Sequence, residues 1–442
     1  MHDVLRAAEG VAEHAEVFHL RARSLPLGFD SEGLSSAKLR QIEGVAVRVI
    51  ADGKLGYATS TNLQEPQQIA DAAASAAAYG ETCALRFAHA SGTPLDGVYS
   101  ERIETIDAEQ LASLGEAIHK RILEAAPDVE ASVKLETTVN EVRLANTEGV
   151  DVQERRSLVS ARVEVTRTQD GDIFVLGDGI NARAPDAITP EAATANVLKL
   201  LELAEHLVPA PSGQLPVVFT PAGSIALLLP LILGLSGKSV HLTISPLAEK
   251  LGDTVFDSRL SLIDDGLEIA GSAAGGFDDE GVASQRTPLV EAGVVRNFYY
   301  DLRTAMQTGV QSTGNGYKGG VLGGGDFRSA PGVSLSNLIV GAGSASQEDL
   351  IREIQSGVLV DTVLGLGQGN LNAGDFSNNV SVAYRIENGR ITGRVKNLMI
   401  SGNAYRLLKD NLLGLGNDAK WVYGRLHVPS IAVSDVSVAA KS

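Results

Sequence analysis

Apolar and polar positions alternate with two different periods along the first two hundred residues. A helical period, with one apolar stripe every three to four residues, marks a first group of segments: 3–14, 66–79, 106–126 and 189–206. Extended segments with alternating or β-rich composition form a second group: 15–25, 43–50, 54–60, 129–145 and 150–169. The first half of the chain is therefore predicted to mix helices with strands.

Local signals at the ends of these segments support the assignment. Ala51-Asp52-Gly53 separates two strand-like runs and predicts a β-hairpin. Thr189 is suited to cap a helix whose first position is Pro190. Residues 146–149, Asn-Thr-Glu-Gly, predict the turn between two long strands.

The composition changes after a segment rich in Pro and Gly at residues 207–216. Beyond it, short strand-like runs and glycine turns dominate, which predicts a mostly antiparallel β domain with few helices. We expect an α+β protein of two domains, with an N-terminal mixed α/β domain at 1–210 and a C-terminal β-rich domain at 211–442.

Charge and length narrow the classes of function. The 442 residues carry a formal net charge of −17, so binding to nucleic acid or to an acidic membrane is disfavoured. The longest apolar run, 222–235, is interrupted by Pro230 and is too short to span a bilayer. No signal peptide is recognisable at the N-terminus, and the single cysteine, Cys83, cannot form an internal disulfide. We expect a cytoplasmic protein.

The usual catalytic motifs are missing from the sequence. None of the eight histidines lies in HExxH or HExxxH, and there is no GxSxG for a serine nucleophile. His14 and His19 are close in sequence, but the segment between them passes from helix to strand, so a shared metal ion is disfavoured. Cys83 is better explained as a small buried side chain than as a catalytic thiol.

Two further patterns have simpler explanations than a ligand site. GLSGKS at 234–239 is similar to a phosphate-binding loop, but Ile232 stands where that loop requires its first glycine. The acidic run at 278–280 precedes Gly281 and could hold a hard cation, but we expect a solvent-facing turn.

A longer block, FDDEGVASQRTPLVEAGVVRNFYYDLRTAMQTGVQSTGNG at 277–316, resembles the central motif of the TldD/PmbA peptidase family. Further similar segments are GVAVRVIADGKLGYATS at 44–60, GNLNAGD at 369–375, IENG at 386–389 and ISGN at 400–403. The resemblance covers nearly the whole chain, and it implies a zinc-peptidase setting.

The zinc-binding branch of that family carries HExxxH on a helix and a later cysteine ligand. Here Leu227, Leu228 and Ile232 stand at about the positions of the two histidines and the glutamate, and no late cysteine follows. Since these side chains have no lone pair for a metal ion, the chain is similar to the PmbA (TldE) branch. We therefore expect no catalytic residue, metal ligand or cofactor in this chain, with zinc in a TldD-like partner.

The resemblance also implies a heterodimer whose two subunits enclose a cavity for small unfolded peptides, which are degraded or matured there. Glycine-rich tracts suit a close approach of substrate backbone, so Gly275, Gly276, Gly314 and Asn315 are candidates to shape the peptide cleft, although turn chemistry explains them equally well. Two alternatives stay open: a stand-alone homodimeric peptide-binding or chaperone-like protein without hydrolytic activity, and an autonomous enzyme using His14, His19 and acidic groups. A homodimer can also form when the partner is absent.

Overall fold

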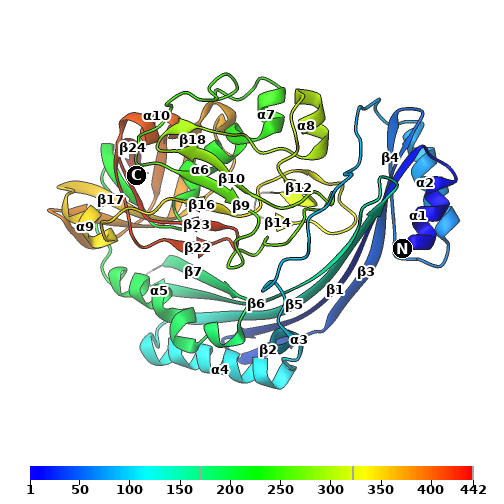
Figure 1. The fold of residues 1–442 in the computed structure, drawn as a ribbon. Helices are drawn as coiled ribbons and strands as arrows, with labels where there is room; N and C mark the ends of the chain where they lie inside the picture. Colours follow the sequence, from blue (N-terminus) through cyan, green and yellow to red (C-terminus); the bar gives the residue numbers. More distant parts are fainter. Residues whose placement is uncertain (170, 321–322, 441–442) are drawn as a thin grey trace.

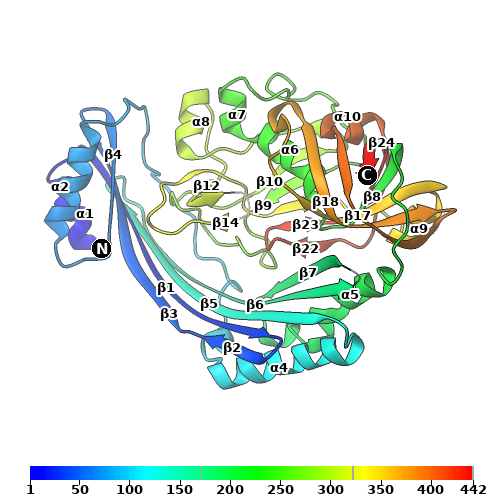
Figure 2. The same ribbon diagram turned by 180° about the vertical axis from the view of Figure 1, so that it is seen from behind.

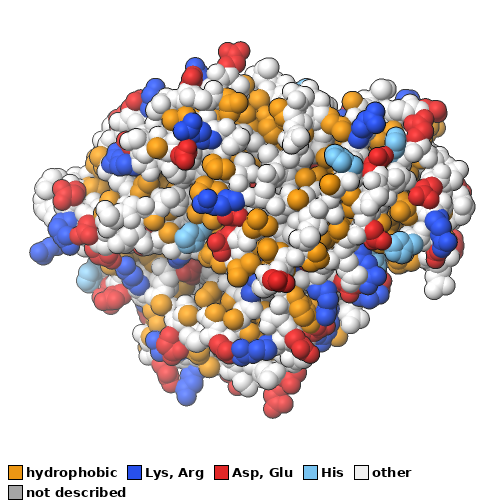
Figure 3. All heavy atoms as spheres, viewed as in Figure 1, with side chains coloured by type: hydrophobic (Ala, Val, Ile, Leu, Met, Phe, Trp, Pro, Cys, Tyr) orange, Lys and Arg blue, Asp and Glu red, His pale blue; other side chains and the backbone are white. Residues whose placement is uncertain are grey.

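A strongly curved sheet from the first half of the chain wraps around one side of a β-rich body formed by the second half (Figures 1 and 2). This computed structural model describes residues 1–169, 171–320 and 323–440. Charged side chains of both signs are scattered over the face shown in Figure 3. No helix within the described ranges is long and apolar enough to cross a membrane.

The curved sheet is antiparallel, with the order β4-β3-β1-β5-β6-β7 and with β2 added alongside β1. Its strands are β1 (His14–Asp30), β2 (Gly33–Ala37), β3 (Arg40–Ala51), β4 (Lys54–Ser60), β5 (Glu130–Asn146), β6 (Asp151–Gln169) and β7 (Asp172–Ala182). The predicted hairpins at Ala51-Asp52-Gly53 and at 146–149 are both present, as β3–β4 and β5–β6. The sequence did not predict β2 and β7, and β1 is longer than expected.

Helices cover the convex face of this sheet (Figure 1). They are α1 (His2–Glu9), α2 (Pro66–Ala77), α3 (Glu101–Glu104), α4 (Ala108–Ala125) and α5 (Pro190–Leu203). Odd-numbered positions of β1 face them: Val17 packs in the cluster with α1 and α2, and Leu27 in the cluster with α4. Even-numbered positions therefore face the concave side. Thr189 accepts a hydrogen bond from Ala192 N at 3.1 Å, as the predicted cap requires.

The C-terminal body contains two larger sheets and several very short strands. The first sheet comprises β8 (Gly213–Phe219), β17 (Ser356–Leu364), β18 (Asp375–Glu387), β19 (Arg390–Val395), β20 (Leu398–Asn403), β21 (Leu412–Leu415) and β24 (Ile431–Ala440). The second comprises β9 (Leu262–Asp265), β10 (Arg286–Glu291), β11 (Val294–Val295), β16 (Leu338–Val340), β22 (Lys420–Val422) and β23 (Leu426–Val428). Pairing is mostly antiparallel, but β8–β17 and β16–β23 are parallel.

The remaining elements of this body are short. Two small ladders join β12 (Gly316–Tyr317) to β15 (Gly332–Val333) and β13 (Gly319–Gly320) to β14 (Gly323–Gly324). The helices are α6 (Ile225–Leu235), α7 (Gly237–His241), α8 (Leu302–Thr308), α9 (Gln347–Arg352) and α10 (Ala404–Asp410). The α+β class with helices and several sheets is therefore confirmed.

The two halves share apolar packing. One hydrophobic cluster contains Ile118 of α4 and Val197 of α5 together with Leu359 and Tyr384 of the C-terminal sheet. The hydroxyl of Tyr384 donates a hydrogen bond to the carbonyl of Leu200 at 2.8 Å. The division into domains at residue 210 stays a prediction.

Candidate functional site

Helix α6 contains the three positions, Leu227, Leu228 and Ile232, that the resemblance predicts to correspond to zinc ligands and base. Leu227 and Leu228 are completely buried and Ile232 is 1% exposed, all within the main core of the C-terminal body. Saturated hydrocarbon side chains cannot donate electron pairs to Zn²⁺. These residues therefore do not fit a zinc ion, and their contribution is to core packing.

No group of three or more His, Cys, Asp or Glu side chains is placed to hold a metal ion within 1–169, 171–320 and 323–440. His14 and His19 both lie on β1, five positions apart, so their side chains leave opposite faces of the sheet. Each has its own carboxylate: His14 Nδ1 lies 2.7 Å from Glu148, and His19 Nε2 lies 3.0 Å from Glu43. The structure does not bring the two imidazoles together.

The acidic turn at the start of the motif block is buried. Asp278 and Glu280 are each 1% exposed, which corrects the expectation that these acids face solvent. The turn itself is present, with Gly281 at φ +78°. Asp278 accepts backbone hydrogen bonds from Glu280, Val282 and Gly316 at 2.8–3.0 Å, so its carboxylate fixes the turn against β12. Burial, reinforced by the charge of Glu280, raises the pKa of Asp278.

Glu280 links this turn to two other parts of the molecule. One carboxylate oxygen accepts a hydrogen bond from Arg48 Nη1 at 2.7 Å, and the other accepts from the backbone N–H of Leu302, the first residue of α8, at 2.7 Å. Arg48 on β3 also donates from Nε to Glu16 on β1 at 2.9 Å. Arg48 is thus a buried cation between two buried carboxylates, and it joins the concave sheet face to the motif block.

The four candidate cleft residues lie close to this network. A side-chain carbon at Gly275 would overlap the guanidinium of Arg156, and one at Gly276 would overlap the carbonyl oxygen of Thr93. Both glycines are therefore required by close packing within the chain. Their role in a peptide cleft stays a prediction.

Gly314 and Asn315 lie inside the motif block. Gly314 has φ +73°, and a Cβ there would lie 2.5 Å from the carbonyl oxygen of Ala283. Asn315 is completely buried and donates to Asp264 at 2.6 Å and to the carbonyl of Ser334 at 3.0 Å. These contacts organise the block. Contact of either residue with a peptide also stays a prediction.

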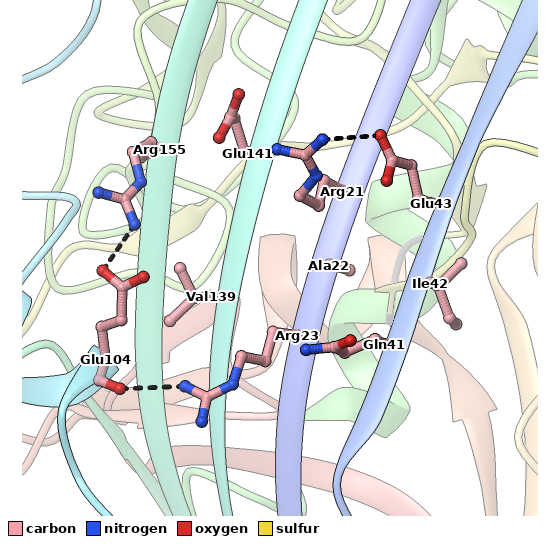
Figure 4. Close-up of a pocket in the computed structure, with 10 residues that line it drawn as sticks. All are labelled: Arg21, Ala22, Arg23, Gln41, Ile42, Glu43, Glu104, Val139, Glu141 and Arg155. Carbon is pink, nitrogen blue, oxygen red and sulfur yellow. Dashed lines mark hydrogen bonds and ion pairs between the residues drawn. The ribbon is translucent and has the colours of Figure 1, made fainter. Parts of the chain in front are cut away.

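A separate hollow of about 480 Å³ lies on the convex face of the sheet, lined by residues of β1, β3, β5 and β6 and by Glu104 of α3 (Figure 4). Its charges are paired with one another. Arg21 lies 2.9 Å from Glu43, Arg155 lies 2.6 Å from Glu104, and Arg23 donates to the carbonyl of Glu104 at 3.1 Å. Because each guanidinium already has an acceptor, this hollow offers a ligand little unused charge.

Sequence reasoning missed the buried charges at the centre of the molecule, although a signal for one of them exists. Arg48 interrupts an otherwise apolar run, Gly-Val-Ala-Val-Arg-Val-Ile, on a segment predicted to be one strand of a β-hairpin. A cation at such a position needs a buried anionic partner. The sequence does not indicate which of the 54 carboxylates that partner is.

Comparison with known proteins assigns this arrangement to a family. A model of the PmbA/TldA metallopeptidase C-terminal domain matches residues 212–440. Models of domain 1 and of the central domain of the same metallopeptidase match residues 15–78 and 101–201. The metalloprotease PmbA of Escherichia coli O157:H7 is 22% identical over 471 residues, which span 99% of this chain and 94% of the relative.

Two solved structures share the fold. TldE from Thermococcus kodakarensis superposes with a TM-score of 0.86 at 23% identity, over 100% of both chains. A protein of Thermotoga maritima described as a modulator of a DNA gyrase superposes with a TM-score of 0.86 at 25% identity, over 99% of this chain and 100% of the other.

Proposed function

Because the chain belongs to the PmbA/TldD metallopeptidase family, we propose that it is the non-catalytic subunit of a two-subunit zinc peptidase. In this proposal a TldD-like partner supplies the zinc ion, its ligands and the base that activates water. The present chain supplies part of the enclosure that receives small unfolded peptides, which the complex degrades or matures in the cytoplasm.

The apolar character of α6 carries this proposal. A catalytic zinc site needs three protein ligands and an open position for water. The corresponding positions, Leu227, Leu228 and Ile232, are fully packed in the core and have no donor atoms. Converting this helix into a metal site would require polar groups in an interior that offers them no partner, at a cost of several kcal/mol. The packing of this helix in the core of the chain therefore supports the proposal.

The shape of the molecule supports a role in enclosing substrate. The concave side of the sheet faces the C-terminal body (Figure 2), and side chains of both line a pocket of about 240 Å³. In this proposal a partner subunit completes the enclosure, which would exclude folded proteins while admitting an extended chain. An extended peptide can add to an exposed sheet edge through backbone hydrogen bonds, largely independently of its sequence.

The test is to purify the chain alone and together with a TldD-like protein that carries HExxxH. We expect less than about a tenth of an equivalent of zinc on the chain alone, because its residues offer no closed ligand set. We expect a stable heteromer by light scattering, and hydrolysis of an unfolded peptide only by the heteromer. Hydrolysis by this chain alone, with near one equivalent of zinc, would overturn the proposal.

The same experiment distinguishes the proposed subunit from the stand-alone alternative. A chain that binds peptide as a homodimer, and that forms no complex with any HExxxH-bearing partner, would identify a binding or chaperone-like protein. A homodimer that dissociates when the partner is added supports the proposed subunit role.

A further inference from the structure

A pocket of about 240 Å³ lies between the concave sheet and the motif block. The sheet contributes Phe18, Val142 and Arg156, and the strand β12 and the residue after it contribute Tyr317 and Lys318. Figure 1 shows β12 on the concave side of the sheet. Small-molecule sites commonly measure about 300–1,000 Å³. This pocket therefore has room for the end of a chain or a small ion.

The pocket is cationic although the protein is acidic. Four cationic side chains line it, against two carboxylates: Arg156, Arg183, Lys318 and Arg425, with Asp279 and Asp326. The whole chain, in contrast, carries −17. A local excess of positive charge with low-dielectric walls concentrates anions.

These charges are not equally available to a ligand. Arg183 donates to five backbone carbonyls, so its guanidinium is occupied by the protein. Asp326 is paired with Arg328 at 3.0 Å. The guanidinium of Arg425 makes one hydrogen bond among the described residues, a long one of 3.4 Å to the carbonyl of Leu335. Its guanidinium therefore retains donors for a ligand.

Lys318 is 7% exposed, and its ammonium group uses two of its three donors within the chain. It donates to the carbonyl of Ser329 at 2.9 Å and to the hydroxyl of Tyr57 at 3.3 Å, and it lies 4.7 Å from the centre of the Phe18 ring. Burial, followed by the charge of Arg48, lowers the pKa of Lys318 to about 8. The side chain is still mostly charged at pH 7, with one donor left over.

Tyr317 provides an independent sign of a ligand. Its side chain lines the pocket and is 5% exposed, and its hydroxyl has no hydrogen-bond partner among the described residues. Buried tyrosine hydroxyls normally have a hydrogen-bond partner, because a buried hydroxyl without one lowers the stability of the folded state. The pocket thus combines an unsatisfied neutral donor with two cationic donors.

We propose that this pocket binds the terminal carboxylate of an extended peptide, held by the Tyr317 hydroxyl, the Lys318 ammonium and the Arg425 guanidinium. The inference rests on the proposed function, which makes peptide the substrate. A carboxylate carries one negative charge and suits a pocket that also contains Asp279, whereas a phosphate dianion would meet stronger repulsion there. The apolar walls at Phe18 and Val142 suit an apolar last residue.

The test measures binding of a flexible Gly/Ser-rich peptide ending in leucine to the full chain by calorimetry. Two comparison ligands are measured in the same way: the same peptide with an amidated C-terminus, and inorganic phosphate. We expect the free acid to bind at least about tenfold more tightly than the amide, since hydrogen bonds to a charged group are worth more than neutral ones. We also expect phosphate to compete only weakly.

Tyr317→Phe is the decisive variant, because the hydroxyl it removes makes no hydrogen bond among the described residues. We expect it to fold normally and to lose about fivefold to tenfold in affinity for the free acid, with no change for the amide. Lys318→Met should lose more for the free acid only. Arg21→Met, on the opposite face of the sheet, is the matched control and should leave both affinities unchanged.

Equal affinities for acid and amide, or no peptide binding by the wild-type chain, would overturn the assignment. Tight phosphate binding that displaces the peptide would overturn it in favour of a phosphate site. None of these outcomes alters whether the chain forms a zinc-dependent heteromer, so failure of the pocket and failure of the proposed function are separable.

Discussion

Arg48 Nη1 lies 2.7 Å from Glu280 Oε1, although 232 positions separate the two residues in the chain. Arg48 belongs to the curved sheet and Glu280 to the acidic turn of the motif block. Both are almost completely buried. A pair of this kind is sensitive to the loss of one partner, because the other is left as an isolated charge in a low-dielectric interior.

Replacing Arg48 with Met should therefore destabilise the protein by about 3–5 kcal/mol, since Glu16 and Glu280 both lose their counter-charge. Urea denaturation followed by circular dichroism measures this change. Arg21→Met is the matched control: its pair with Glu43 is exposed and should be worth at most about 1 kcal/mol. Equal losses of unfolding free energy in the two variants would show that the buried ion pair of Arg48 and Glu280 stabilises the protein no more than an exposed pair does.

Glu16 should make stability depend on pH. Burial outweighs the attraction of Arg48 and raises the pKa of Glu16 from 4.5 to about 7. Between these values the folded state holds a proton that the unfolded state has released, so the free energy of unfolding falls as pH rises from about 4.5 to 7. The contribution is at most about 3 kcal/mol.

Glu16→Gln removes this titration while keeping the shape of the side chain. The difference in unfolding free energy between variant and wild type should therefore shift in favour of the variant between pH 5 and pH 8. Urea titrations at the two pH values measure it. A difference that is independent of pH would contradict the raised pKa.

Gly275→Ala should destabilise the protein by about 1–3 kcal/mol, because the added methyl group displaces the guanidinium of Arg156. That shift would disturb the 2.9 Å hydrogen bond from Arg156 to the carbonyl of Phe277. Gly332→Ala is a suitable control, since nothing lies within 4 Å of a Cβ at that position. Thermal unfolding of both variants provides the comparison, and a neutral Gly275→Ala would show that Arg156 relocates freely.

Leu228→Glu should prevent stable folding or cost more than about 4 kcal/mol, because it introduces a carboxylate into a fully buried position. Leu228→Met conserves volume and should cost less than about 1.5 kcal/mol. Soluble yield and denaturation midpoints distinguish the two. A stable Leu228→Glu protein would mean that α6 can accept polar groups, which would contradict its role in core packing.

The long hairpins could be predicted from the sequence because their alternating pattern and their turn residues are local features. β5 and β6 alternate over their full lengths, and the turn between them has a recognisable composition. β7 was missed because Gly177 and Gly179 dilute its pattern, and glycine is unfavourable in strands. The end of α1 was predicted too late: the helix stops before Gly10, and β1 begins at His14.

The buried charges at the centre of the molecule were harder to predict from the sequence, for a different reason. Whether Asp278 faces water or packs against β12 depends on segments more than thirty residues away, and composition does not encode that contact. Tyr317 and Lys318 also stand in a glycine-rich run that by itself predicts only turns. The apolar character of Leu227, Leu228 and Ile232, in contrast, follows directly from the identity of these residues.

The five carbonyls bound by Arg183 come from three separate stretches: around Val98, at Ser157 and from Ile269 to Ser272. A single side chain can satisfy all of them only when the three stretches have already met. The bonds are therefore gained or lost together, and unfolding of either half exposes the guanidinium and its acceptors at once. We expect the chain to melt in one cooperative transition, and a fragment ending at residue 210 to lack three of the five acceptors that hold Arg183.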